Sequence, residues 1–295
     1  LNEVDGKAER SFVMEIQRLN QLKGLRIVVS SRSNFTVRYS MPGYRSTKLR
    51  PLDDNQIQIY FNEKEWETIK GTRALHHLLS NPMMVTVYKE ICSVIEEFEN
   101  LEFLDWILPV KNSTDLFHNY YVAQLALTMK RSVTDGEKML LAKICISEIL
   151  PAIAYDYECK HRLNYDNKEF RILLNDILNK RTVDESNLLS IQEYFRQIEL
   201  PELTVVKVID FITNEMRLLC RDNLVTVFPH QIYRDYLSAQ WIVTQSSKGN
   251  ILDFWNGRVI PQPVMTHIRL CSGEYWRNGI ACYVHSAGMG MKDDS

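Results

Sequence analysis

The sequence predicts a mostly α-helical protein with a small α/β part. Apolar side chains recur at the spacing of one helix face through most of the chain, as in residues 7–22 and 134–157. Runs rich in β-branched residues are few and short, and the clearest are 25–29 and 224–228. We therefore expect packed helices, with strands limited to a few short segments.

The length and the net charge of the chain limit the number of domains and the kinds of partner that we expect. Its 295 residues are enough for two or three domains, and an apolar fraction of 45% is ordinary for a folded protein. A formal net charge of −2 predicts no general attraction to nucleic acid or to an anionic membrane. The longest apolar runs are much shorter than the ~18 residues that indicate a membrane span. We expect a cytoplasmic protein without a membrane partner.

The six cysteines indicate free thiols rather than a disulfide framework. No Cys-x-x-Cys pair occurs, and most cysteines stand among apolar residues, which predicts buried thiols in a reducing compartment. Cys159 and His161 are close in sequence, but two ligands without a second pair make a poor zinc site. We therefore expect no metal site at these residues.

The N-terminal segment combines a helix with a predicted buried strand. Residues 7–22 have a helical pattern that Gly24 terminates, and the apolar run 25–29 indicates a buried parallel strand with a polar tip. Ligands of open α/β sheets bind beyond the carboxyl ends of the strands, so Arg32 stands where a phosphate-binding cation would lie. A solvated loop arginine is the simpler interpretation of Arg32 taken alone.

A second short strand and a capped helix are expected next. Residues 48–52 indicate a last strand that leaves the sheet. Asp53 or Asp54 then caps a helix over 55–62, because an aspartate oxygen can accept the first backbone N–H groups of a helix.

A proline divides the following helical region. Residues 73–95 form a helical pattern that breaks at Asn81 and Pro82, because the residue before a proline disfavours the helical conformation. Pro82 can start the second helix, where its missing N–H costs nothing, and can also present its ring to a flat base. Further helical patterns cover 101–131, 134–157 and 159–186, and another opens at 201–202.

The segment around His230 is the most informative of the chain. Residues 216–219 and 225–228 flank a polar turn at 221–223, which predicts a β-hairpin. An amphipathic helix follows over 231–243, so His230 stands between a strand and a helix, where a ring nitrogen can reach an anionic ligand. Helices followed by a hairpin make a winged-helix fold. Helix capping or core packing of His230 is the interpretation that the segment alone favours.

Four short segments, in this order, resemble motifs of the NACHT subfamily of STAND signalling ATPases. Residues 1–4 (Leu-Asn-Glu-Val) are similar to the end of an extended Walker B segment, and residues 29–32 (Val-Ser-Ser-Arg) to sensor 1. Residues 81–84 (Asn-Pro-Met-Met) resemble the proline segment of the first helical domain. Residues 228–230 (Phe-Pro-His) resemble the histidine motif of the winged-helix domain.

The resemblance implies a role for one residue of each segment. Glu3 would be the carboxylate that orients the attacking water, although a surface glutamate is the alternative. Arg32 would reach the terminal phosphate of ATP, and Pro82 would lie against the adenine. His230 would touch the β-phosphate of ADP and hold the resting state.

The resemblance also implies an order of domains. These are the C-terminal part of a P-loop NTPase sheet domain at 1–62, a helical domain at 63–131, a winged-helix domain at 132–245 and the start of a further helical domain at 246–295. No Gly-x-x-x-x-Gly-Lys-Ser/Thr loop occurs, and the Walker B aspartate that would help to hold Mg²⁺ would precede Leu1. We expect the chain to be the C-terminal portion of a longer protein, cut inside its ATPase core.

The function that the resemblance implies is a signalling switch controlled by ATP and ADP, with Mg²⁺ in the full-length protein. ADP would keep the switch closed through His230, and exchange for ATP would release that contact and allow self-association. The family implies a setting in innate immunity or anti-phage defence. The trigger ligand would bind a sensor region outside these residues.

Two other functions stay open on the sequence. A winged-helix transcription regulator needs a basic recognition helix, but the helix 231–243 carries Arg234 as its one cation, beside Asp235. Nucleic acid is therefore an unfavoured partner. The other alternative is a helical scaffold that binds no nucleotide.

These residues alone are expected not to hydrolyse ATP, because the phosphate-binding glycine loop is not among them. A phosphate-release assay on the purified chain should give the same rate as a variant with both Glu3 and Arg32 changed to alanine. Turnover faster than that of the double variant would contradict the prediction.

Overall fold

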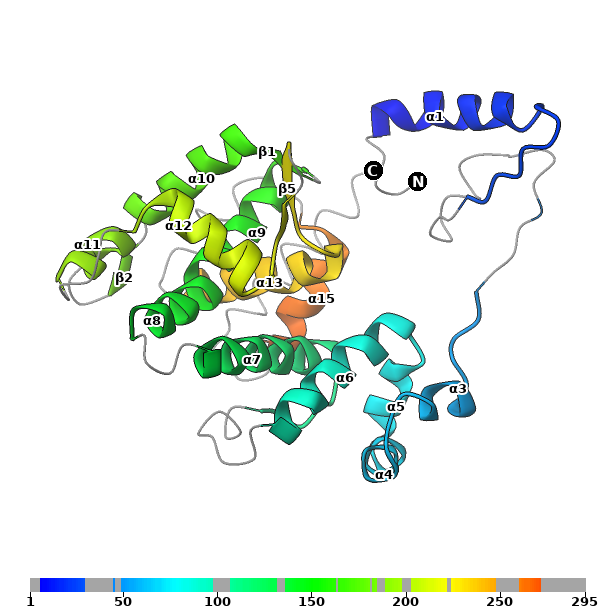
Figure 1. Cartoon of the computed structure of the whole chain (residues 1–295), viewed down its shortest axis with the longest axis horizontal. Coiled ribbons are helices and arrows are strands. Elements are labelled where there is room, and N and C mark those ends of the chain that lie inside the picture. Colours follow the sequence, from blue (N-terminus) through cyan, green and yellow to red (C-terminus); the bar gives the residue numbers. More distant parts are fainter. Residues whose placement is uncertain are drawn as a thin grey trace, which may run out of the picture. The chain divides into compact units, whose positions relative to one another are not determined.

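A computed structural model of the chain (Figure 1) consists of two compact units, Leu1–Arg50 and Pro51–Ser295, which are described one at a time. The structure describes residues 6–29, 45, 49–97, 107–131, 136–162, 164–180, 182–184, 189–197, 203–221, 224–247 and 260–271.

The described part of the first unit is mostly one amphipathic helix, α1 (Gly6–Leu19). Val13 and Ile16 are buried, and an ion pair between Arg18 and Glu15 lies on its exposed side. The chain turns after the helix and passes through Gly24, whose φ of +83° is a conformation that residues with a Cβ rarely adopt. The predicted helix is confirmed.

The two strands predicted in the N-terminal region are not formed by their described residues. Residues 25–29 have no strand conformation, and Val28 is 95% exposed. Residues 49–52 likewise form no strand; Leu49 is exposed, and the Leu52 N–H bonds to the Ser80 carbonyl at 2.7 Å. β-branched residues make a strand only beside a second strand that accepts their backbone hydrogen bonds, and the described residues supply none here. The predictions of a buried strand at 25–29 and of a last strand at 48–52 are wrong for the described residues.

The second unit begins with four helices, and the first two start at capping boxes. Asp53 and Asn62 each accept a backbone hydrogen bond at the start of a helix, and Gln56 and Glu65 bond back to them, which makes two capping boxes. The predicted division near Pro82 is confirmed. The helices are α3 (Asp54–Gln58), α4 (Glu63–Gly71), α5 (Arg73–Leu79) and α6 (Pro82–Glu97).

After α7 (Ser113–Arg131), one continuous helical run contains a π-helical turn. It consists of α8 (Gly136–Ile144), the π-helix η2 (Cys145–Ile149) and α9 (Leu150–Cys159). The cause is Pro151, which has no N–H and whose ring would clash with the carbonyl one turn earlier. The Leu150 N–H bonds five residues back, to the Cys145 carbonyl, and the widened turn accommodates the proline.

A small antiparallel sheet carries the predicted hairpin. Its order is β1–β5–β4, with β1 (Tyr165–Asp166), β5 (Val225–Val227) and β4 (Cys220–Arg221). The hairpin is confirmed, although its first strand begins at Cys220 rather than in 216–219. Met216, Leu218 and Leu219 are instead buried in the core.

Six more helical elements and a second small sheet complete the described part of the unit. The elements are α10 (Asn167–Lys180), β2 (Thr182–Asp184), β3 (Leu189–Ser190), α11 (Ile191–Gln197), α12 (Val205–Asp210), the π-helix η3 (Phe211–Glu215), α13 (Gln231–Ser247) and α15 (Gln262–Cys271).

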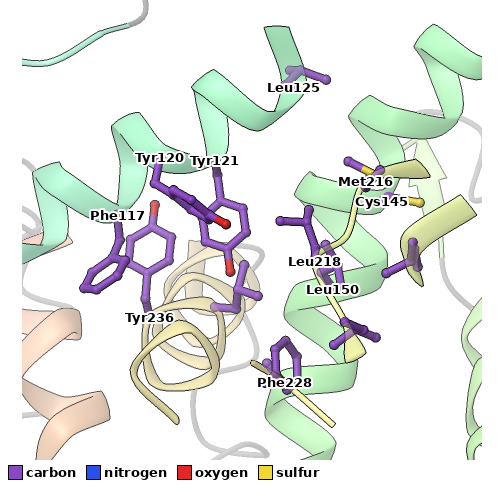
Figure 2. Close-up of a cluster of buried hydrophobic side chains, with 14 of the residues drawn as sticks. Phe117, Tyr120, Tyr121, Leu125, Cys145, Leu150, Met216, Leu218, Phe228 and Tyr236 are labelled. Atoms are coloured by element: carbon purple, nitrogen blue, oxygen red, sulfur yellow. The ribbon is translucent and has the colours of Figure 1, made fainter. Parts of the chain in front are cut away.

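One hydrophobic core extends through the second unit, from Ile57 of α3 to Ile268 of α15. Figure 2 shows part of it, where Phe117 and its aromatic neighbours on α7 face Tyr236 of α13. The helix α13 packs against α7, α9 and α15, and therefore lies at the centre of this core.

Two further expectations concern the cysteines and the membrane. Cys92 and Cys145 are buried free thiols as predicted, but Cys220 on the hairpin is an exposed free thiol. None of the helices that the structure describes has the length and apolar character needed to cross a membrane.

Leu150→Ala is expected to destabilise the protein by about 2–5 kcal/mol, because the side chain is fully buried and its removal leaves a cavity. Leu224→Ala removes the same atoms from a side chain that is 77% exposed, and should change the free energy of unfolding by less than about 0.5 kcal/mol. Urea unfolding measures both. Equal effects of the two changes would show that the core is assigned incorrectly.

Candidate functional site

The structure describes two of the four residues predicted to contact a nucleotide. Glu3 and Arg32 lie outside the described residues. Pro82 and His230 belong to the second unit, where each stands at the start of a helix and is exposed.

His230 is the N-cap residue of α13, and its ring makes the capping contact. The Ile232 N–H donates to Nδ1 of His230 at 3.2 Å, and the Tyr233 N–H bonds to the His230 carbonyl at 3.3 Å. Because Nδ1 accepts a hydrogen bond, the neutral ring carries its proton on Nε2, which makes that nitrogen a donor. The capping interpretation is therefore confirmed.

Pro82 occupies the first position of α6, where proline fits best. Asn81 forms the cap: its Oδ1 accepts from the Met83 N–H at 3.0 Å, and its carbonyl accepts from the Val85 N–H at 3.2 Å. The proline ring is thus held by a fixed turn and its face is exposed, as contact with a flat base would require.

The helices that carry Pro82 and His230 both pack against α7. An aromatic cluster forms the contact between α7 and α13, and it consists of Phe117, Tyr120, Tyr121, Tyr233 and Tyr236. The rings of Tyr121 and Tyr236 stack with centroids 5.6 Å apart, and those of Tyr120 and Tyr233 are 5.0 Å apart. The tyrosines of α7 are packing residues.

A polar contact connects α6 to the same cluster. Gln124 donates to the Glu90 carboxylate at 3.3 Å. Burial, together with the negative charge of Glu90, raises the pKa of Tyr233 to about 12, so its phenol stays protonated at neutral pH. Tyr233 follows His230 by three residues, so the first turn of α13 is held against α7 close to the exposed imidazole.

His267 on α15 closes the other side of the aromatic cluster. Its Nδ1 is hydrogen-bonded to Oγ1 of Thr114 at 2.8 Å, and its ring meets Phe117 and Tyr236 edge-on. The side chain is 3% exposed, and burial lowers its pKa to about 4. His267 is therefore neutral at physiological pH and serves packing rather than ligand binding.

The sequence did not reveal Glu90, Gln124 or His267. Each of them is a polar residue within an otherwise apolar helical pattern, and that departure from the pattern was the available signal. Such a departure marks a polar residue, but it does not indicate which other helix carries the residue's hydrogen-bond or packing partner.

Two exposed residues carry groups that can contact an anionic oxygen or a flat base. His230 and Pro82 are both exposed; an imidazole can hydrogen-bond to a phosphate oxygen, and a proline ring can lie against a base. Within the described part of the chain, no three His, Cys, Asp or Glu side chains are grouped so that they could hold a metal ion.

Comparisons with protein-family models, with curated proteins and with solved structures found no match to this chain.

Acid is expected to destabilise the protein through His267. The pKa of an unfolded histidine is about 6.5, whereas that of His267 is lowered to about 4 by burial, so the unfolded chain binds a proton more readily. The contribution of the neutral His267 ring to the free energy of unfolding is complete above about pH 6.5. It is lost as the pH falls towards 4, by roughly 3 kcal/mol in all.

Urea unfolding at several pH values measures this effect. His267→Gln, which does not titrate, should flatten the loss between pH 6.5 and 4. An unaltered pH dependence in His267→Gln would rule out His267 as the source.

Proposed function

We propose that this chain is part of a cytoplasmic, nucleotide-dependent signalling switch of the NACHT type, closed by ADP and able to self-associate when ATP replaces it. The observation that carries the proposal is the exposed imidazole of His230, which is held at the junction of a hairpin strand and a helix. The resemblance to the NACHT family predicts that the histidine that contacts ADP stands at this junction.

The order of the elements around His230 supports a winged-helix domain in 132–245. A helix, α9, precedes the edge strand β1; three further α-helices, α10, α11 and α12, lie before the hairpin β4–β5; and β5 pairs between the other two strands. This order is typical of winged-helix domains. The separate helices α4, α5 and α6 suit the helical domain that we propose at 63–131.

The chemistry of the described residues is consistent with ADP retention. Nε2–H of His230 would donate to an oxygen of the β-phosphate while Nδ1 keeps its capping contact. Pro82 would lie against the adenine, and Arg32 would bind the additional phosphate of ATP. A switch of this kind works only if ADP binds the closed state more tightly than the open state.

Burial of Arg234 disfavours the alternative of a DNA-binding regulator. Arg234 is 7% exposed and forms an ion pair with Glu158, so the single cation of the helix 231–243 does not face solvent. The helix before the hairpin carries Lys207, which is paired with Glu137. Neither helix presents the basic face that phosphate contacts require.

His230→Ala in the full-length protein is expected to release bound ADP roughly tenfold faster or more, the factor that one hydrogen bond to a charged group supplies. His230→Asn should do the same, although asparagine is a good N-cap residue and would preserve the start of α13. The release of fluorescent ADP measures this rate, and both variants should be active without a trigger.

The control is His161→Asn, which changes an exposed histidine whose φ of 51° asparagine also tolerates. It should retain ADP normally. Purified protein that contains no adenine nucleotide, or ADP release unaffected in both His230 variants, would refute the proposal and favour a nucleotide-free scaffold.

A further inference from the structure

Two successive residues in the last turn of α9 hold the two elements that flank His230. Tyr157 bonds to β5, which ends three residues before His230, and Glu158 bonds to α13, which begins one residue after it. The histidine itself is exposed, so its position depends on how these two elements are fixed.

The contact to the hairpin is a buried hydrogen bond. The Tyr157 hydroxyl donates to the Thr226 carbonyl at 2.6 Å, and both residues are fully buried. Burial raises the pKa of Tyr157, so the hydroxyl remains a donor. The ring also packs edge-on against Phe228, two residues before His230, with centroids 5.5 Å apart.

The contact to the helix is a buried ion pair. Nε of Arg234 donates to the Glu158 carboxylate, and the two side chains are 9% and 11% exposed. Nη1 of the same guanidinium donates to the Arg162 carbonyl at 3.0 Å, just beyond the end of α9. Arg234 lies one helical turn after His230, on the same side of α13. The planar guanidinium therefore fixes both the distance and the rotation of the first turn of α13 relative to α9.

We propose that Tyr157, Glu158 and Arg234 are positioning residues for His230, which fix the direction of its ring from α9. These residues also set how long ADP is retained, and this second effect rests on the proposed function. A buried ion pair adds little net stability, because the loss of hydration offsets the attraction, whereas its directional bonds restrict geometry. The role therefore lies in the geometry of His230 rather than in the stability of the fold.

The test replaces the ion pair with apolar side chains of similar size, Glu158→Leu together with Arg234→Met. Such replacements usually preserve or increase stability, so the fold should persist while the directional bonds are lost. The matched control is Glu215→Leu with Lys138→Met, which removes a half-exposed ion pair between η3 and α8.

Two measurements on the full chain report on His230 directly. One is hydrogen exchange of the Ile232 amide, which donates to His230 Nδ1. The other is the NMR signal of the ring Cε1–H, assigned by its loss in His230→Asn. In the apolar variant we expect the amide to exchange about tenfold faster or more and the ring signal to shift, with an unfolding temperature close to that of the wild type.

Tyr157→Phe provides a second, milder variant. It removes a single neutral hydrogen bond and keeps the ring, so the fold should survive and the Ile232 amide should exchange roughly fivefold faster. The proposal is overturned if the apolar variant or Tyr157→Phe folds but leaves both the ring signal and the Ile232 exchange unchanged. It is also overturned if the control, Glu215→Leu with Lys138→Met, responds equally.

ADP release from the full-length protein separates this inference from the proposed function. If both hold, the apolar variant accelerates ADP release in the wild-type background but has no further effect when His230 is already asparagine. If His230→Asn itself leaves ADP release unchanged, the proposed function fails, whereas the ring signal and the Ile232 exchange still decide the positioning role.

Discussion

Burial of α13 is the constraint on which the rest of the second unit depends. Six consecutive residues of this helix, 234–239, are buried, because α7, α9 and α15 surround it. Ser238 and Ala239 have no exposed surface, and their small side chains let the neighbouring helices approach closely. A helix enclosed in this way cannot slide or rotate far without disrupting the core, so the position of its first turn is restricted.

The apolar and the polar contacts around α13 have different tasks. The aromatic cluster and His267 bury α13 by apolar and edge-on ring contacts, which supply stability but tolerate small rotations. The polar bonds from Tyr157 and Glu158 add direction at the N-terminal end. A binding residue on a rigid element, supported by directional contacts behind it, is how proteins hold ligand-binding side chains accurately.

The sequence predicted those parts of the fold that depend on local chemistry. Asp53 as a cap, Pro82 as a helix start and the hairpin before His230 are all present, since each needs only a few neighbouring residues. The strand expected at 25–29 is not formed, because a strand needs partners that no local pattern specifies. Burial of Arg234 was equally invisible in the sequence, because its partners Glu158 and Arg162 are more than 70 residues away. Of the candidate site, the capping position of His230 was predictable and its supporting contacts were not.

The π-helical turn at Cys145–Ile149 has a consequence for everything that follows it on the same helical run. It contains one residue more than an α-helical turn, and one residue corresponds to about 100° of rotation around the helix axis. Pro151, several residues upstream, therefore determines which face of α9 meets the hairpin and α13. A helix without the widened turn would direct Tyr157 and Glu158 about a quarter-turn away from the elements they now hold.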